Sequence, residues 1–161
     1  MASITLQFSA RATVEGEVID WFEGGEYDHV DAVLPDGLLG ARIGADGAAA
    51  PGVQLRPFGY AKFIRTERVT LPATQAQADA WEVWLRSKIG EPYDWEAILG
   101  FALDESLHER RHLICSAYQA SALMLAPPPW FPRPLCEHPS RITPRDLRLV
   151  ISPWEVAAVV G

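Results

Sequence analysis

Two residues far apart in the chain, Cys115 and His29, have the types and settings that nucleophilic cysteine catalysis requires. Cys115 follows an apolar approach and begins a run of small and apolar residues that is typical of a helix. A thiol on the first turn of a helix lies near the positive end of the helix dipole and near unpaired N–H groups, and both favour the nucleophilic thiolate. His29 lies in a β-like run, from which an imidazole can accept the thiol proton. We therefore expect the Cys115 sulfur to lie within about 4 Å of a ring nitrogen of His29.

A third polar residue is needed to orient the imidazole, and the residues after His29 offer one. Pro35-Asp36-Gly37 is a strong turn signal that leads into a returning strand. With Asp36-Gly37 as a two-residue turn, Asp31 falls opposite Arg42, which could hold it by a charge pair. Asp31 also shares a strand face with His29, so it is the preferred third member. Two alternatives for this role stay open, Asp46 and Gln54.

The composition is that of a globular protein with a single domain over residues 1–161. Hydrophobic residues make up 48% of the 161 residues and charged residues 22%, which is enough to build a core. The net charge of −7 disfavours nucleic acid or an anionic membrane surface as the main ligand. No apolar run approaches the ~20 residues that span a bilayer. The composition does not indicate an oligomeric state.

The N-terminus and the cysteines predict the compartment. The first residues lack a basic region followed by an apolar core, so we expect no signal peptide and a location in the cytoplasm or in a phage particle. The two cysteines, Cys115 and Cys136, cannot make a disulfide framework and favour a reducing environment. Cys136-Glu137-His138 matches no zinc spacing, so we expect no metal site and no cofactor.

The hydrophobic pattern predicts an α+β fold in which helices pack on an antiparallel sheet. Thr74 is suited to cap a helix that ends near Gly90, and Thr143-Pro144 is suited to begin a short turn of helix. Further helices are expected over 14–22 and 95–103 and from Cys115 to 125, and a proline-rich loop over 127–134. The expected strands cover residues 4–8, 27–34, 38–43, 53–57 and 60–71.

Two short segments resemble a known family. Gly90-Glu91-Pro92-Tyr93-Asp94-Trp95, followed by Cys115-Ser116 at the start of a helix, resembles the G-x-P-Y-x-W and C-S segments of NlpC-type cysteine hydrolases. Here His29 precedes the cysteine, and this order resembles the circularly permuted branch, which includes relatives of lecithin retinol acyltransferase. The hairpin after Asp28 also looks like that of small hydrolases encoded near phage tail genes.

The resemblance implies a papain-like domain that cleaves a small peptide or amide substrate, such as a bacterial cell-wall peptide, through a thioester on Cys115. From its expected place at the start of a helix, the Cys115 N–H is a candidate donor to the oxyanion, with Tyr93 as a second donor. Ser116 and Trp95 complete the expected substrate and oxyanion site. The thioester would equally allow an acyltransferase or thioesterase acting on lipid-like substrates. The third possibility is a catalytically incomplete structural or binding module of a phage or bacterial assembly.

Overall fold

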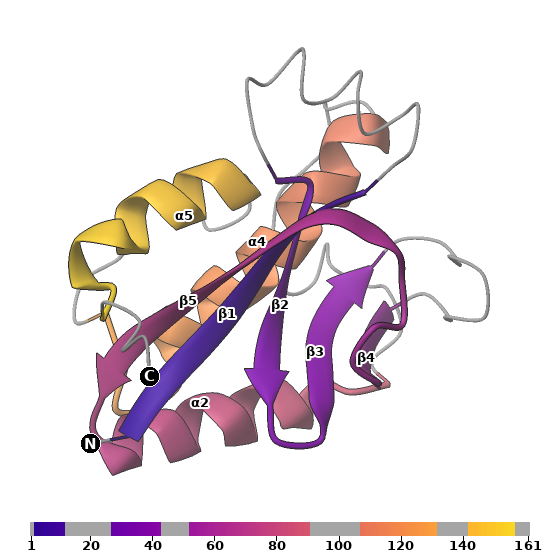
Figure 1. Ribbon diagram of the computed structural model, residues 1–161. Helices are drawn as coiled ribbons and strands as arrows, with labels where there is room; N and C mark the ends of the chain where they lie inside the picture. Colours follow the sequence, from indigo (N-terminus) through magenta and orange to yellow (C-terminus); the bar gives the residue numbers. More distant parts are fainter. Residues whose placement is uncertain (1, 12–26, 43–51, 91–106, 132–141, 157–161) are drawn as a thin grey trace.

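A computed structural model (Figure 1) describes residues 2–11, 27–42, 52–90, 107–131 and 142–156. In these residues the strands are β1 (Ala2–Arg11), β2 (His29–Leu34), β3 (Gly37–Arg42), β4 (Gly52–Arg56) and β5 (Phe63–Ala73). The helices are α2 (Gln75–Ser87), α4 (Leu107–Leu125) and α5 (Pro144–Ile151), followed by the 3-10 turn η2 (Ser152–Trp154). Each strand that the sequence predicted is present, whereas the helices expected over 14–22 and 95–103 lie outside the described residues.

The strands form one open antiparallel sheet in the order β4-β3-β2-β1-β5. The long pairing of β1 with β5 runs from Ala2 opposite Ala73 to Arg11 opposite Phe63, with an irregularity at Ala10 and Arg11. Two segments outside the sheet bond to its edges: the Val156 N–H donates to the Thr70 carbonyl of β5 at 2.9 Å, and the Gly90 N–H donates to the Val53 carbonyl of β4 at 3.1 Å. The predicted α+β class with helices on an antiparallel sheet is confirmed.

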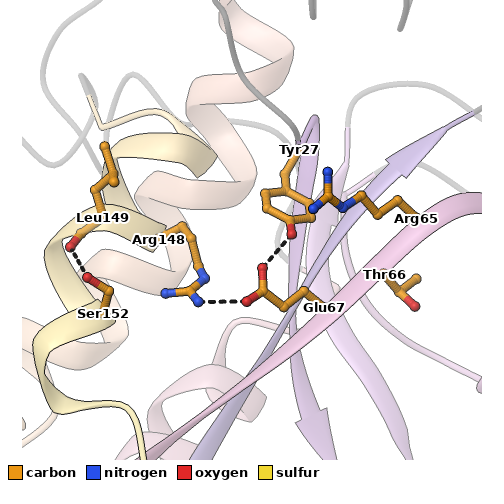
Figure 2. Close-up of a pocket in the computed structure, with 7 residues that line it drawn as sticks. All are labelled: Tyr27, Arg65, Thr66, Glu67, Arg148, Leu149 and Ser152. Atoms are coloured by element: carbon orange, nitrogen blue, oxygen red, sulfur yellow. Dashed lines mark hydrogen bonds and ion pairs between the residues drawn. The ribbon is translucent and has the colours of Figure 1, made fainter.

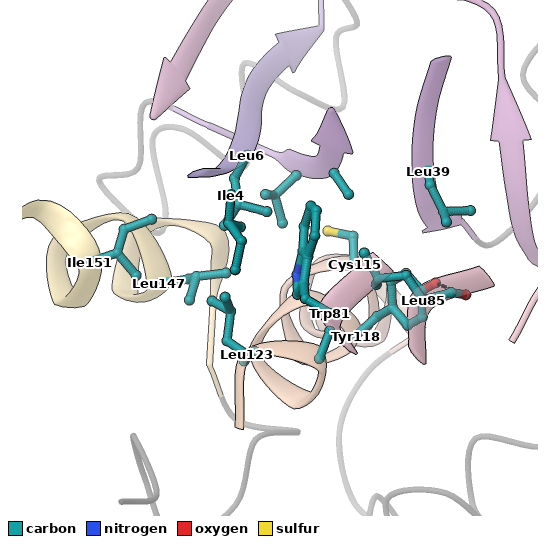
Figure 3. Close-up of a cluster of buried hydrophobic side chains, with 14 of the residues drawn as sticks. Ile4, Leu6, Leu39, Trp81, Leu85, Cys115, Tyr118, Leu123, Leu147 and Ile151 are labelled. Atoms are coloured by element: carbon teal, nitrogen blue, oxygen red, sulfur yellow. Dashed lines mark hydrogen bonds between the residues drawn. The ribbon is translucent and has the colours of Figure 1, made fainter. Parts of the chain in front are cut away.

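The helices bury their apolar side chains against one face of the sheet, with α4 behind the central strands in Figure 1. Ile4, Leu6 and Phe8 alternate along β1 and point into this core, as their spacing predicts. Figure 3 shows side chains from all three helices meeting those of the sheet in one cluster, and the cluster includes Cys115. No helix among the described stretches is both long and apolar enough to cross a membrane.

Side-chain caps set the starts of two helices where the sequence predicted them. Thr74 and Thr143 each accept a hydrogen bond from the backbone N–H three residues later, and the side chains of Gln77 and Asp146 bond back to the cap. Pro144 occupies the first position of α5, where a missing N–H costs nothing. α5 continues to Ile151, so the stretch predicted as a short turn of helix is an eight-residue helix.

The start of α4 differs from the prediction. The helix begins at Leu107 rather than at Cys115, so Cys115 is in its interior. The residues from Leu107 to Arg111 are leucine, histidine, glutamate and arginine, and most of these have high helix propensity. No glycine or proline interrupts the stretch from 107 to 125. The change from charged to apolar composition near residue 113 therefore lies within the helix and does not mark its beginning.

The hairpin of β2 and β3 also has a different register from the one expected. Leu34 pairs with Gly37, which makes Pro35 and Asp36 the two turn residues. Proline has no N–H to donate to a strand ladder, and its fixed φ suits the second position of a turn. The predicted pairing of Asp31 with Arg42 is therefore wrong, because continuation of the observed register sets Asp31 opposite Gly40.

Candidate active site

A polar cluster lies where β2 and β3 stop pairing and α4 packs across both strands. The ladder between the strands runs from Leu34 with Gly37 to Ala32 with Leu39, and Asp31 and His29 lie beyond its last pair. A Cβ built on Gly40 would stand 1.9 Å from Asp31 Oδ1. The carboxylate of Asp31 therefore occupies the space that any side chain at position 40 would need.

His29, Asp31 and Cys115 are in contact and almost fully buried, with 2%, 0% and 1% of their surfaces exposed. His29 Nε2 lies 2.8 Å from Asp31 Oδ1. Cys115 hydrogen-bonds to His29 and interacts with its charge. The structure thus brings together the three residues that the sequence proposed as nucleophile, base and orienting acid.

The electrostatics of the cluster favour a protonated His29. Burial alone opposes the charged imidazolium. The negative charge of Asp31 is the largest opposing influence, followed by the charge of Cys115 and by hydrogen bonds from His29 to both residues. Together these attractions outweigh burial and raise the pKa of His29 to about 9. His29 is therefore held as an imidazolium beside the carboxylate of Asp31 and the sulfur of Cys115.

Two hydrogen bonds set the position of α4, and therefore of Cys115, on the sheet. One turn after the cysteine, Gln119 Nε2 donates to the Leu39 carbonyl of β3 at 2.9 Å. The Tyr118 hydroxyl donates to the Leu85 carbonyl of α2 at 2.7 Å. Both side chains are completely buried. Because each bond has a backbone acceptor, sliding α4 along the sheet would leave buried polar groups unpaired.

Tyr60 is part of this cluster, although no sequence pattern singled it out. Its hydroxyl donates to Asp31 Oδ2 at 2.9 Å and lies 3.3 Å from His29 Nε2. The sequence placed Tyr60 in a strand, whereas the structure places it in the turn before β5. The available signal was the Pro57-Phe58-Gly59 turn, which indicates the turn but not its neighbour in space.

The other predicted site residues are not brought to the cluster by the described structure. Tyr93, Trp95 and the alternative Asp46 lie outside the described residues. Ser116 is fully buried, and its hydroxyl donates to the Ile142 carbonyl, so it ties α4 to the chain before α5 rather than facing a substrate. The predicted oxyanion role of the Cys115 N–H was based on a helix that starts at Cys115, whereas Cys115 lies in the interior of α4, where an N–H usually bonds to the carbonyl four residues earlier.

A separate cavity of about 540 Å³ lies between α5 and β5 (Figure 2). Glu67 crosses it, accepting hydrogen bonds from the Tyr27 hydroxyl and, at 2.6 Å, from Arg148. The bond from Arg148 is the main cause that holds the pKa of Glu67 below its ordinary value. The cavity is lined by Tyr27, Arg65, Thr66, Glu67, Arg148, Leu149 and Ser152, so its polar contacts fasten α5 to the sheet and are distinct from the Cys115 cluster.

No family model, curated protein or solved structure matches this chain. Within the described residues, no three histidine, cysteine or acidic side chains gather as metal ligands would. The contacts of Cys115, His29 and Asp31 are therefore the basis on which a function can be assigned.

Proposed function

We propose that this protein is a cysteine hydrolase in which Cys115 is the nucleophile, His29 the general base and Asp31 the residue that orients the imidazole. One observation carries the proposal: a buried imidazole contacts a thiol and, at 2.8 Å through Nε2, a carboxylate. Nucleophile, base and orienting group in mutual contact define a catalytic triad by geometry, whatever the order of the residues in the chain.

The contacts support one proton path. Because Asp31 holds Nε2 of His29, we infer that Cys115 gives its proton to Nδ1, which leaves a thiolate beside an imidazolium. The thiolate attacks a carbonyl carbon, and the carbonyl π electrons move to oxygen to form a tetrahedral oxyanion. The oxyanion collapses to a thioester as the C–N bond breaks and His29 gives its proton to the leaving amine. His29 then takes a proton from water, the hydroxide releases the acyl group as a carboxylic acid, and the thiolate is restored.

A papain-like architecture in the permuted order is the finer form of this proposal. Its support is the histidine on β2, the cysteine on a helix that crosses β2 and β3, and an antiparallel sheet that holds them together. The resemblance at residues 90–95 and 115–116 adds the substrate class, a peptide or amide such as a cell-wall peptide. A second nucleophile in place of water would turn the same thioester into the intermediate of an acyl transfer.

A catalytically incomplete binding module is the second candidate, and the burial of the thiol favours it. Cys115 is 1% exposed, so a substrate reaches it only if part of the surrounding structure moves. Its position in the interior of α4 also removes the backbone donor that a helix start would provide to an oxyanion. The two candidates differ in one property, which is whether Cys115 can form and release an acyl group.

p-Nitrophenyl acetate tests this difference, because its activated ester acetylates a competent nucleophile without further recognition. We expect acetyl-Cys115 in peptide mass maps and continued release of nitrophenol, with His29→Ala reducing both. The rate at which iodoacetamide labels Cys115 should also fall in His29→Ala, because the imidazole that accepts the thiol proton is removed. Acetyl on Cys136 alone, or Cys115 rates that do not respond to His29→Ala, would contradict the hydrolase and favour the binding module.

A further inference from the structure

Tyr60 enters the polar cluster from a segment that belongs to neither β2 nor α4. It follows β4 in a turn in which the Tyr60 N–H donates to the Pro57 carbonyl at 3.2 Å. Gly59 has a φ of +74° at the third position of this turn, a conformation that favours glycine. The turn therefore fixes the direction in which the next residue leaves it. That residue, Tyr60, is half-buried, whereas His29, Asp31 and Cys115 are almost completely buried.

The ring of Tyr60 is held by contacts that lead back to Asp31. The buried Arg56 guanidinium lies 5.5 Å from the centre of the Tyr60 ring and donates to the Gly40 carbonyl at 2.9 Å. Gly40 is also the residue whose missing side chain makes room for the Asp31 carboxylate. Phe63 meets the same ring edge-on, with the ring centres 5.7 Å apart. The contacts thus run from Asp31 to Tyr60, from Tyr60 to Arg56 and from Arg56 to Gly40, which lies against Asp31 again.

We propose that Tyr60 is a positioning residue that locks the carboxylate of Asp31 and, through it, the imidazole of His29. This role rests on the proposed function of Cys115 and His29. The contacts that carry it are those of the Tyr60 hydroxyl with Asp31 and His29.

The two oxygens of Asp31 explain why a second donor matters. Oδ1 faces His29 Nε2 at 2.8 Å, and Oδ2 accepts the Tyr60 hydroxyl at 2.9 Å. Hydrogen bonds to a charged acceptor are stronger than neutral ones, and two of them on opposite oxygens stop the carboxylate from rotating about its Cβ–Cγ bond. A site residue keeps its productive geometry only when its own rotamer is fixed by neighbours in this way. Without the hydroxyl, Asp31 Oδ2 would lose this donor.

The pKa of His29 measures this lock directly and needs no substrate. The charged and titratable groups known to face the imidazole are Asp31 from its own strand, Cys115 from α4 and Tyr60 from the turn. The chain has four histidines, so imidazole NMR resonances can be followed against pH, with His29→Ala assigning the resonance of interest. In Tyr60→Phe the ring remains and only the hydroxyl is lost. A carboxylate that has lost this donor holds the imidazolium less well, so we expect the His29 midpoint to fall by about 0.5–1 unit.

Tyr27→Phe is the matched control, because Tyr27 is also buried and its hydroxyl is also hydrogen-bonded, but this hydroxyl donates to Glu67 in the separate cavity between α5 and β5. We expect the control to leave the His29 midpoint in place, and Tyr60→Phe to slow acetylation of Cys115 by p-nitrophenyl acetate several-fold. A midpoint unchanged or raised in Tyr60→Phe overturns the positioning role. If instead His29→Ala fails to affect Cys115 acetylation in the wild-type background, the proposed function itself is overturned.

If the Tyr60→Phe protein does not fold, a second measurement on the protein without this substitution tests the same role. With 3-fluorotyrosine at the four tyrosines, the fluorine resonance of Tyr60 should shift with pH at the midpoint of His29. The resonance of Tyr27 should stay flat through that range and serves as the internal control. A Tyr60 resonance that does not follow His29 overturns the lock.

Discussion

The two ends of the hairpin formed by β2 and β3 differ in how regularly the strands pair and in which side chains are buried there. At the turn, Leu34 and Gly37 pair regularly around Pro35 and Asp36, and the surrounding side chains are apolar or exposed. At the other end the pairing of the two strands stops after Ala32 and Leu39, and buried polar side chains gather. One end therefore fixes the register, and the other end uses that register to place the site.

A glycine on β3 marks each end, and each is required by a different neighbour. A Cβ on Gly37 would stand 2.3 Å from the Arg56 carbonyl oxygen, which is backbone and cannot turn aside. A Cβ on Gly40 would stand 1.9 Å from the Asp31 carboxylate, which is the end of a side chain and can rotate away. A side chain at position 37 would therefore disturb the backbone of the sheet, whereas one at position 40 would displace the Asp31 carboxylate from the site.

The largest effect we expect at the site end is a loss of stability as the pH rises. The folded-state pKa of His29, about 9, exceeds the ordinary value of 6.5, so folding favours the protonated imidazole. This contribution is complete below pH 6.5 and is lost as the pH rises through 9. A difference of this size corresponds to about 3 kcal/mol in the free energy of unfolding.

Urea unfolding at pH 6 and pH 9.5 measures this loss. Asp31→Asn removes the largest influence that raises the pKa of His29, so its stability should change much less between the two pH values. Asp36→Asn is a matched control at the turn end, because this exposed carboxylate bonds to Arg86 rather than to the site. If the stability of the Asp31→Asn protein depended on pH as strongly as that of the wild type, Asp31 would not be the group that stabilises protonated His29.

The two glycines provide the next test, with effects of intermediate size. We expect Gly37→Ala to lower the free energy of unfolding by about 1–3 kcal/mol, because backbone must shift, and to leave the His29 pKa unchanged. We expect Gly40→Ala to cost less stability but to push Asp31 aside, so the pKa of His29 should fall towards 6.5. Urea unfolding and imidazole NMR on both variants give the comparison. The contrast between the two ends is contradicted if Gly37→Ala also lowers the pKa of His29, or if Gly40→Ala lowers the free energy of unfolding and leaves that pKa unchanged.

The smallest effect concerns Ser116, the neighbour of the cysteine. Its buried hydroxyl donates to the Ile142 carbonyl, so Ser116→Ala should cost about 1 kcal/mol of stability through one lost hydrogen bond. The reaction of Cys115 with p-nitrophenyl acetate should be unchanged. A large drop in that reaction, with stability preserved, would return Ser116 to the substrate site that the sequence proposed for it.

Local patterns were sufficient to predict most elements of the fold. The alternation of Ile4, Leu6 and Phe8 and the caps at Thr74 and Thr143 depend on neighbours within a few residues, and each is present as predicted. The apolar run from Cys115 does not reveal the start of α4, because the charged residues before it also have high helix propensity and continue the same helix. The Asp36-Gly37 pair does not reveal the hairpin register, because the missing N–H of Pro35 places proline in the turn instead of in the strand ladder.

The site shows a different limit. Cys115, His29 and Asp31 could be selected from the sequence because the chemistry of their side chains is distinctive and the spacing of His29 and Asp31 puts them on one strand face. Tyr60 could not, because its contact with Asp31 crosses 29 residues and depends on the turn after β4 and on the stacking of Arg56. Such a contact follows from the tertiary arrangement, which no local period encodes.

The backbone bonds at the outer strands have a consequence for how copies of this protein meet. β4 and β5 are the edge strands of an open sheet, and an unpaired edge is a template on which another chain can add a strand. Gly90 occupies the Val53 carbonyl on one edge, and Val156 occupies the Thr70 carbonyl on the other. Each bond fills a rung that an incoming strand would need. We therefore expect these two backbone amides to hinder the pairing of another chain at their own rungs of the sheet edges.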